Sequence, residues 1–245
     1  MNDEHVIGFI KRPAASPAAQ SDWVVQCDFD GTISLVDVTD SLLERFGQPG
    51  WRELEADWEE GKIGSRECMK GQIPLLDMNP AELDDHLDSI AIDPHFPNFV
   101  RAAESAGQQV QVISDGIDYA IRRILARHGL GHLQVIANHL VQDDPRRWKL
   151  QSPYASAACV RASGNCKCER LAEQRNLQRQ VLYVGDGASD FCVSGKADFV
   201  LAKARLIAYC LDHQLPHAAF DDFSDALALL QDITAQVGAT ARAVA

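Results

Sequence analysis

Short apolar runs alternate with stretches of helical periodicity over much of the chain. The runs at residues 23–27, 110–113 and 181–184 are almost wholly apolar, and polar residues follow each of them directly. Shorter runs of the same kind lie at 133–137 and 199–201. Runs this short and this apolar are typical of strands buried on both faces of a parallel sheet.

Helical periodicity fills the intervals between these runs. One apolar face repeats through residues 96–103 and ends before Gly107, and another repeats through 117–128 and ends before Gly129. Glycine is favoured just after a helix because it adopts the left-handed conformation. Strands that alternate with helices predict an α/β fold with a doubly wound parallel sheet, whose ligands bind beyond the carboxyl ends of the strands.

Residues 36–93 interrupt the alternation and show helical periodicity alone. Trp51 and Trp58 are spaced for one helix face, and Asn79-Pro-Ala-Glu82 has the cap residue, first-turn proline and third-position acid of a helix N-terminus. We therefore predict a small helical cap domain at 36–93, inserted after the first strand and lying over the strand ends.

This division assigns residues 22–35 and 94–237 to the sheet domain. Residues 1–21, which contain the linker-like stretch Pro13-Ala-Ala-Ser-Pro17, are predicted to form a flexible N-terminal tail. Residues 238–245 are predicted to form a flexible C-terminal tail.

The charge balance excludes some partners. The 245 residues include 35 acidic and 23 basic side chains, for a formal net charge of −12. Such a chain repels phosphate backbones and anionic lipid, so a general nucleic-acid or membrane-surface binder is disfavoured. No apolar run approaches the roughly 20 residues of a membrane-spanning helix. The N-terminus lacks the apolar core of a signal peptide, so we expect a cytoplasmic protein. The pattern indicates no oligomeric state.

Most of this acidity lies in the predicted cap. Residues 37–93 contain 15 acidic and 5 basic side chains. The cap therefore disfavours polyanionic substrates, whereas a small phosphorylated metabolite remains compatible with the nearly neutral sheet domain.

The seven cysteines do not predict a disulfide framework or a zinc site. Their number is odd and they are scattered, which fits a reducing compartment. Cys159, Cys166 and Cys168 match no common zinc spacing and have no histidine nearby in the sequence. We interpret them as small packed residues.

Two acids follow the first apolar run, in the sequence Asp28-Phe-Asp30-Gly-Thr32. A carboxylate at a strand end can attack an electrophile, and Gly31 would let the chain turn sharply so that the second acid points the same way. Two acids this close repel each other, so a cation is expected between them. Taken alone, the pattern is equally compatible with an acidic turn.

Similar polar residues follow the other two long runs. Ser114-Asp-Gly116 offers a hydroxyl and backbone N–H groups to an anion, although a simple helix cap explains it equally well. Asp186 and Asp190 lie in a glycine-containing loop and could hold a hard cation. Lys167, at the start of a helical stretch, could offset the charge of a phosphoryl group.

The order of acid pair, hydroxyl, lysine and acid pair resembles the haloacid dehalogenase superfamily of phosphatases, over about residues 23–230. A helical insert after the first motif resembles its C1-cap, phosphoserine-phosphatase-like branch. A narrower resemblance, to the methylthiopentenyl-phosphate phosphatases of methionine salvage, rests on the cysteines flanking Lys167, on Asp37 and on the stretch 204–217.

The resemblance implies Mg²⁺-dependent hydrolysis of a small phosphomonoester through an aspartyl-phosphate. It assigns Asp28 as nucleophile and Asp30 as general acid and base. It assigns phosphate binding to Thr32, Ser114, Asp115, Gly116 and Lys167. It assigns Mg²⁺ to the Asp28 carboxylate, the Asp30 backbone carbonyl and Asp186, with Asp190 orienting Lys167 or a metal-bound water.

Departures from the family pattern leave the substrate open. The second motif has Asp115 where glycine is usual, Asp37 occupies the position of a substrate-binding glutamate, and Gln72 replaces a substrate-binding arginine. Arg66 either substitutes for that arginine or is a surface charge. Trp51, Trp58 and Met69 either contact an apolar substrate end or pack inside the cap.

Three other functions share part of this pattern. Transfer of the phosphoryl group to an alcohol instead of water uses the same residues. A catalytically idle ligand-binding domain would not need a suitable residue at every catalytic position. A receiver domain is much shorter and has no place for the helical insert.

Overall fold

The structure is a computed structural model that describes residues 22–230. The two predicted tails, 1–21 and 238–245, lie outside the described residues, as do residues 231–237 of the predicted sheet domain. Within the described part, no helix is both long and apolar enough to span a membrane.

A seven-stranded sheet forms the centre of the molecule, in the order β4-β3-β2-β1-β5-β6-β7. All neighbouring strands are parallel except β3 and β4, which form an antiparallel pair. The strands are β1 (Trp23–Cys27), β2 (Gln109–Ile117), β3 (Gln134–Asp144), β4 (Arg147–Gln151), β5 (Gln180–Gly185), β6 (Phe199–Ala202) and β7 (His217–Ala219). The predicted α/β class is confirmed.

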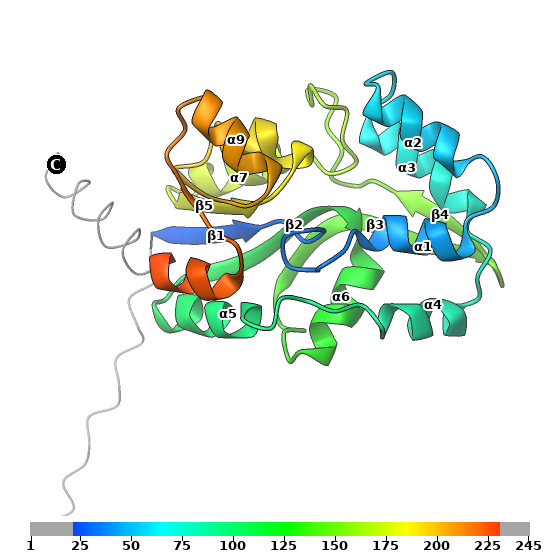
Figure 1. The fold of residues 1–245 in the computed structure, drawn as a ribbon, viewed down its shortest axis with the longest axis horizontal. Coiled ribbons are helices and arrows are strands. Elements are labelled where there is room, and N and C mark those ends of the chain that lie inside the picture. The colour runs from blue at the N-terminus through cyan, green and yellow to red at the C-terminus, as the bar shows by residue number, and fades with distance from the viewer. Residues whose placement is uncertain (1–21, 231–245) are drawn as a thin grey trace, which may run out of the picture.

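Helices cover both faces of the sheet (Figure 1). On one face lie α5 (Phe96–Ser105), α6 (Asp118–Arg127) and a helix over residues 223–230, and on the other lie α7 (Lys167–Asn176) and α9 (Arg205–Asp212). Gly107 and Gly129 follow α5 and α6 with φ values of 76° and 73°, as the sequence predicts. Phe223 packs its ring against Phe96 and Phe99, which joins the end of the described chain to α5.

The register of β1 places its end at the reversal of strand order. Cys27, the last residue of β1, pairs with Val112 of β2 on one side and with Val184 of β5 on the other. All five residues of β1 are buried, so its side chains fix the strand between both helical layers. The residues that follow β1, β2 and β5 therefore emerge together at one edge, where doubly wound sheets bind ligands.

The segment between β1 and α5 is helical, as predicted. It contains α1 (Val38–Phe46), α2 (Trp51–Glu59), α3 (Ser65–Gln72), a short 3₁₀ turn η1 (Ile73–Leu75) and α4 (Pro80–Leu87). Asn79 and Glu82 form the predicted capping box at the start of α4. α1 packs on α4 and α4 on α6, while α2 and α3 pack on each other (Figure 1).

The hydrophobic core runs without a break from the sheet domain into this segment. Leu42 of α1 and Leu83 of α4 belong to the same buried cluster as Ile121 of α6. The half of the segment nearest the sheet is therefore anchored, and the assignment of residues 36–93 as a separate domain stays a prediction.

Two features of the sheet were not predicted. The β3–β4 hairpin extends well beyond the expected strand at 133–137, and Trp148 of β4 donates a hydrogen bond from Nε1 to the carbonyl of Met78 at 2.9 Å. β2 continues past Ser114 to Ile117, with a register shift after Ile113. Ser114 therefore lies in an irregular strand end, whereas the sequence placed it at the start of a helix.

Candidate active site

A buried lysine lies between two buried aspartates at the carboxyl ends of β1 and β5. Lys167 begins α7, and its Nζ is 2.9 Å from Oδ1 of Asp28 and 2.6 Å from Oδ1 of Asp190. The side chains are only 3%, 6% and 0% exposed, respectively. Charges so poorly hydrated are tolerable only because the ammonium of Lys167 offsets part of the charge of the two aspartates.

Asp190 is held by further donors. Its Oδ1 accepts a 2.5 Å hydrogen bond from the Tyr183 hydroxyl, and its Oδ2 accepts from the backbone N–H groups of Asp186 and Gly187 at 3.0 and 3.2 Å. With both oxygens occupied, Asp190 is suited to orient Lys167 rather than to bind a substrate.

Mutual charge shifts the acid–base properties of this group. Burial raises the pKa of Asp28 well above its usual value, and the nearby Asp190 adds to this, while Lys167 opposes it. Burial acts to lower the pKa of Lys167, but the attraction of Asp190 and Asp28 outweighs burial and the net shift is upward. Lys167 is therefore a permanent cation at this position.

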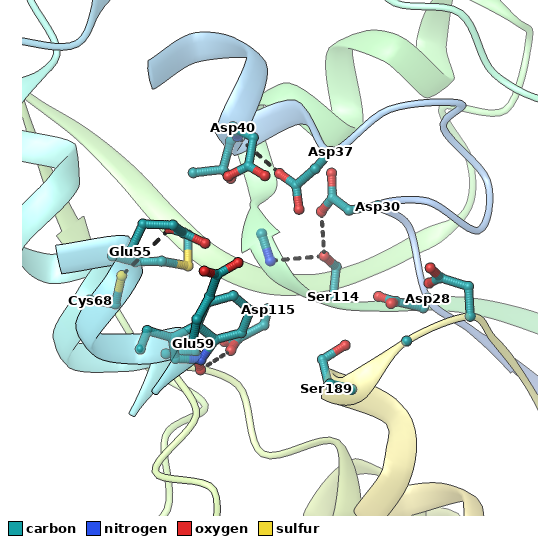
Figure 2. Close-up of a pocket in the computed structure, with 18 of the residues that line it drawn as sticks. Asp28, Asp30, Asp37, Asp40, Glu55, Glu59, Cys68, Ser114, Asp115 and Ser189 are labelled. Carbon is teal, nitrogen blue, oxygen red and sulfur yellow. Dashed lines mark hydrogen bonds between the residues drawn. The ribbon is translucent and has the colours of Figure 1, made fainter. Parts of the chain in front are cut away.

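Asp30 is poised to donate a proton. Burial, and then the charge of Asp37, raise the pKa of Asp30 to about 8. Its Oδ1 accepts from the backbone N–H of Val38 at 2.9 Å, and its Oδ2 accepts from the Ser114 hydroxyl at 3.3 Å (Figure 2). A carboxyl group that is largely protonated near neutral pH can act as a general acid.

The acids at the strand ends also suit a hard divalent cation. Carboxylate oxygens of Asp28, Asp186 and Asp190 lie within 4.8 Å of one another. Gly31, at φ 73°, brings the backbone so close that a Cβ there would lie 2.7 Å from Oδ2 of Asp186. Burial and Asp190 raise the pKa of Asp186, which a bound cation would reverse.

Thr32 also contacts this group, since its hydroxyl donates to Oδ1 of Asp186 at 3.0 Å. The Asp30 side chain is not among the clustered carboxylates. Its backbone carbonyl as a metal ligand therefore stays a prediction.

A cavity of about 370 Å³ lies between these residues and the inserted helices. The strand-end loops contribute Asp28, Asp30, Ser114, Asp115, Gly116, Asp186 and Ser189 to its lining. The opposite wall carries the acids Asp37, Asp40, Glu55 and Glu59, whose carboxylates gather there in Figure 2. Among the described lining residues the basic side chain is Arg205, from α9.

The structure separates the predicted substrate-contacting residues. Asp37 and Gln72 line the cavity, but Asp37 caps α1 by accepting from the Asp40 N–H, and Gln72 donates to Glu55 at 2.7 Å. Arg66 is exposed and lies outside the lining, which favours its interpretation as a surface charge.

Of the three residues that could contact an apolar substrate end, two lie at the cavity and one does not. Trp58 and Met69 line the cavity. Trp51 does not, and instead packs against the core and beneath the guanidinium of Arg52.

Two predicted phosphate-binding residues have structural contacts as well. The Gly116 N–H donates to the Ser114 hydroxyl at 2.8 Å, and a Cβ on Gly116 would lie 2.5 Å from Oδ2 of Asp30. The Asp115 side chain is turned to Ser65 of α3, which donates to it at 2.5 Å. Any phosphate contact of Asp115 would therefore use its backbone.

Several residues that support the site were not predicted from the sequence. Tyr183 orients Asp190, and Ser189 accepts from Lys167 Nζ at 3.0 Å. Asn138 and Asn165 both donate to Asp115. A tyrosine within an apolar strand, a serine in a 3₁₀ turn, an asparagine in a strand and an asparagine in a loop carry no local signal, so only the packing of distant segments reveals them.

Comparison with known proteins gives the class. The family model of the haloacid dehalogenase-like hydrolases matches residues 25–194, more than half of the chain. The chain belongs to this family, and it is an enzyme of the phosphatase type. The resemblance drawn from the motifs is confirmed.

Proteins similar to this chain include several phosphatases. The 2-hydroxy-3-keto-5-methylthiopentenyl-1-phosphate phosphatase of Exiguobacterium sp. is 29% identical over 212 residues, covering 85% of this chain and 97% of that protein. The polyol phosphate phosphatase PYP1 of Saccharomyces cerevisiae is 25% identical, over 86% of this chain and 94% of that protein. A phospho-aspartyl intermediate analogue of phosphoserine phosphatase shares the fold, with a TM-score of 0.65 and 19% identity over 87% of this chain and 99% of that one.

Replacing the buried lysine tests how strongly the fold depends on it. In Lys167→Met, Asp28 and Asp190 lose their cation, so the free energy of unfolding should fall by about 3 kcal/mol in chemical denaturation. The exposed Lys196→Met is the matched control and should change it by less than about 0.5 kcal/mol. Adding Asp190→Asn to Lys167→Met should restore part of the lost free energy of unfolding. Equal stability of Lys167→Met and Lys196→Met would show that Lys167 does not offset the charge of the two aspartates.

Proposed function

We propose that the protein hydrolyses a small phosphomonoester through a covalent aspartyl-phosphate. The observation that carries this proposal is the pairing of a buried, lysine-bound carboxyl group, Asp28, with a second carboxyl group of raised pKa, Asp30, at the edge of one cavity. Lys167 opposes the rise in the pKa of Asp28 and so favours the ionised form that nucleophilic attack requires, whereas Asp30 is suited to proton transfer.

The two carboxyl groups divide the reaction between them. Asp28 attacks phosphorus, the ester P–O bond breaks, and Asp30 gives its proton to the departing oxygen. Asp30, now a carboxylate, takes a proton from a water molecule that attacks the phosphorus of the aspartyl-phosphate. This second attack releases inorganic phosphate and restores both groups.

The charge that builds on the phosphoryl oxygens needs fixed donors. Lys167 is held rigidly at Asp28 and can supply one. The hydroxyls of Ser114 and Thr32 lie at the same edge, held through Asp30 and Asp186. Donors fixed before the reaction need little reorganisation as charge develops.

Asp28 and Asp186 are the residues that would hold Mg²⁺, since both oxygens of Asp190 already accept hydrogen bonds. When bound, the ion would neutralise charge on the phosphoryl group and on its nucleophile. Asp30 carries out the proton transfers, and Lys167 supplies the fixed positive charge.

The acidic wall of the cavity bears on the leaving group. Asp37, Asp40, Glu55 and Glu59 would repel a carboxylate, Arg66 lies outside the lining, and Arg205, the basic side chain among the described lining residues, belongs to α9 and not to this wall. A substrate of the phosphoserine type is therefore disfavoured relative to esters of uncharged alcohols. The relatives named as methylthiopentenyl-phosphate and polyol-phosphate phosphatases support a substrate of the latter kind.

Substitution of the nucleophile tests the reaction. Asp28→Asn keeps the shape of the side chain but cannot form the acyl phosphate, so turnover of p-nitrophenyl phosphate should fall by about a thousandfold or more. Circular dichroism checks that the fold is retained. A folded Asp28→Asn enzyme with near-normal turnover would rule out the covalent route.

Metal removal tests the acidic cluster. Treatment with EDTA should abolish turnover, because Asp28 and Asp186 then face the phosphoryl group without a cation to neutralise their charge. Added Mg²⁺ should restore turnover. Asp186→Asn should need about tenfold more Mg²⁺ for half-maximal activity. Full activity in excess EDTA would remove the cation from the mechanism.

The acidic wall predicts selectivity between two esters that differ by one carboxylate. The kcat/KM for phosphoethanolamine should exceed that for phosphoserine by about tenfold, because the added carboxylate faces Asp40 and Glu59. The difference in kcat/KM between the two esters should become smaller in the double variant Asp40→Asn/Glu59→Gln. It should persist in Glu53→Gln, which changes an exposed acid of α2 outside the lining. Equal kcat/KM values in the unmodified enzyme would show that the wall does not select by charge.

A further inference from the structure

Asp115 is the residue at which the second motif departs from the usual glycine, and the structure places its carboxylate among three separate segments. It is half-buried, and desolvation raises its pKa, although hydrogen bonds from Ser65, Asn165 and Asn138 oppose that shift. A carboxylate at this depth requires donors, and these donors come from α3, from the loop before α7 and from β3.

The two oxygens serve different sides of the cavity. Oδ2 accepts from the hydroxyl of Ser65, the first residue of α3, at 2.5 Å. Oδ1 accepts from the backbone N–H of Asn165 at 2.8 Å and from Asn138 Nδ2 at 3.1 Å. A single carboxylate thus joins the inserted helices to the loops of the sheet domain.

Asn165 links Asp115 to the segment that contains Lys167. It lies two residues before Lys167, and its side-chain amide donates to the carbonyl of Ser114 at 2.9 Å and to that of Ile136 at 2.8 Å. Asp115 and Ser114 therefore fix both the main chain and the side chain of Asn165, immediately before α7 begins.

The other side of the connection reaches the wall of the cavity. α3 carries the lining residues Cys68, Met69 and Gln72. Its N-terminus also touches the sheet domain through the Arg66 N–H, which donates to the carbonyl of Ala162 at 3.3 Å. The Asp115 carboxylate lies at the positive end of α3, where a negative charge is favourable.

We propose that Asp115 is a positioning residue that couples the closed arrangement of α3 over the cavity to the placement of Lys167. Ser65 is its partner on the inserted segment. This inference rests on the proposed function. A glycine at position 115 could not make the connection, so the coupling belongs to chains that carry an acid there and a hydroxyl at the start of α3.

Kinetics separate the two sides of the connection. With p-nitrophenyl phosphate, Ser65→Ala should raise KM by about tenfold with kcat within about twofold, because α3 is loosened while Lys167 keeps its support. Asp115→Ala should also lower kcat by about tenfold, because Asn165 loses its acceptor. The double variant should be no worse than Asp115→Ala alone, since both changes break the same hydrogen bond.

Conservative and control variants show whether the effect is specific. Ser65→Thr keeps the hydroxyl and should restore KM. Asp115→Asn keeps an oxygen for Asn165 and Asn138 and should restore most of kcat. Ser89→Ala removes another hydroxyl of the inserted segment, one that bonds only to the carbonyl of His86, and should match the unmodified enzyme.

Hydrogen exchange provides a readout that is independent of activity. The amides of residues 64–69 should exchange about tenfold faster in Ser65→Ala and Asp115→Ala than in the unmodified enzyme, because the N-terminus of α3 leaves the sheet domain more often. Additive kinetic effects in the double variant, or unchanged exchange at 64–69, would overturn the coupling. An unmodified enzyme without phosphatase activity would instead refute the proposed function and leave the exchange result to decide the coupling.

Discussion

The contact of Lys167 with Asp28 and Asp190 is the interaction on which the rest of the site depends. Burying two carboxylates and an ammonium removes their hydration, and only close pairing with additional hydrogen bonds compensates for that loss. Tyr183 and the backbone at Asp186 supply those additional bonds. Neither the lysine nor the acids could be tolerated alone at this depth, so the start of α7 and the ends of β1 and β5 must be positioned together.

The parallel sheet makes this arrangement possible. Because β1 pairs with β2 on one side and β5 on the other, residues distant in the sequence leave the sheet at one edge. The Asp28 N–H still bonds to the carbonyl of Val184 at 2.9 Å, so the nucleophile is held by the sheet itself. Its placement is therefore fixed by the sheet, whereas the acids that face the substrate's leaving group come from the inserted segment.

The parts of the molecule that follow from local patterns could be predicted from the sequence. The buried strands, the glycines after α5 and α6, the capping box at Asn79 and the order of the motifs all depend on short-range periodicity or composition. The β3–β4 hairpin was missed although β4 alternates polar and apolar residues, because five residues are a short pattern and Trp148 is stabilised by a contact with Met78 far away in the sequence.

The same division applies to the site. Asp28, Asp30 and Asp186 could be singled out as candidates because acids are unusual directly after apolar strands, and Lys167 only through its place in the order of the motifs. Tyr183, Asn138 and Asn165 could not, since their role comes from hydrogen bonds between segments that no local pattern connects.

Both sides of the cavity carry acids, but the sheet side also has the buried ammonium of Lys167 and fixed hydrogen-bond donors, and this asymmetry orients a substrate. Lys167 and the strand-end donors lie on the side of the sheet, while Asp37, Asp40, Glu55 and Glu59 lie on the side of the inserted helices. A phosphomonoester dianion has lower energy with its phosphoryl group toward Lys167 and its organic part toward the acids. Burial, and then Asp37, raise the pKa of Asp40 to about 7, which shows that these acids already repel one another. A further anion on the organic part would add to that repulsion, whereas an uncharged or cationic one would not. The acidity of the inserted segment therefore keeps the phosphoryl group at the end of the cavity near the sheet. It also disfavours a negative charge on the organic part of the substrate, which lies at the other end.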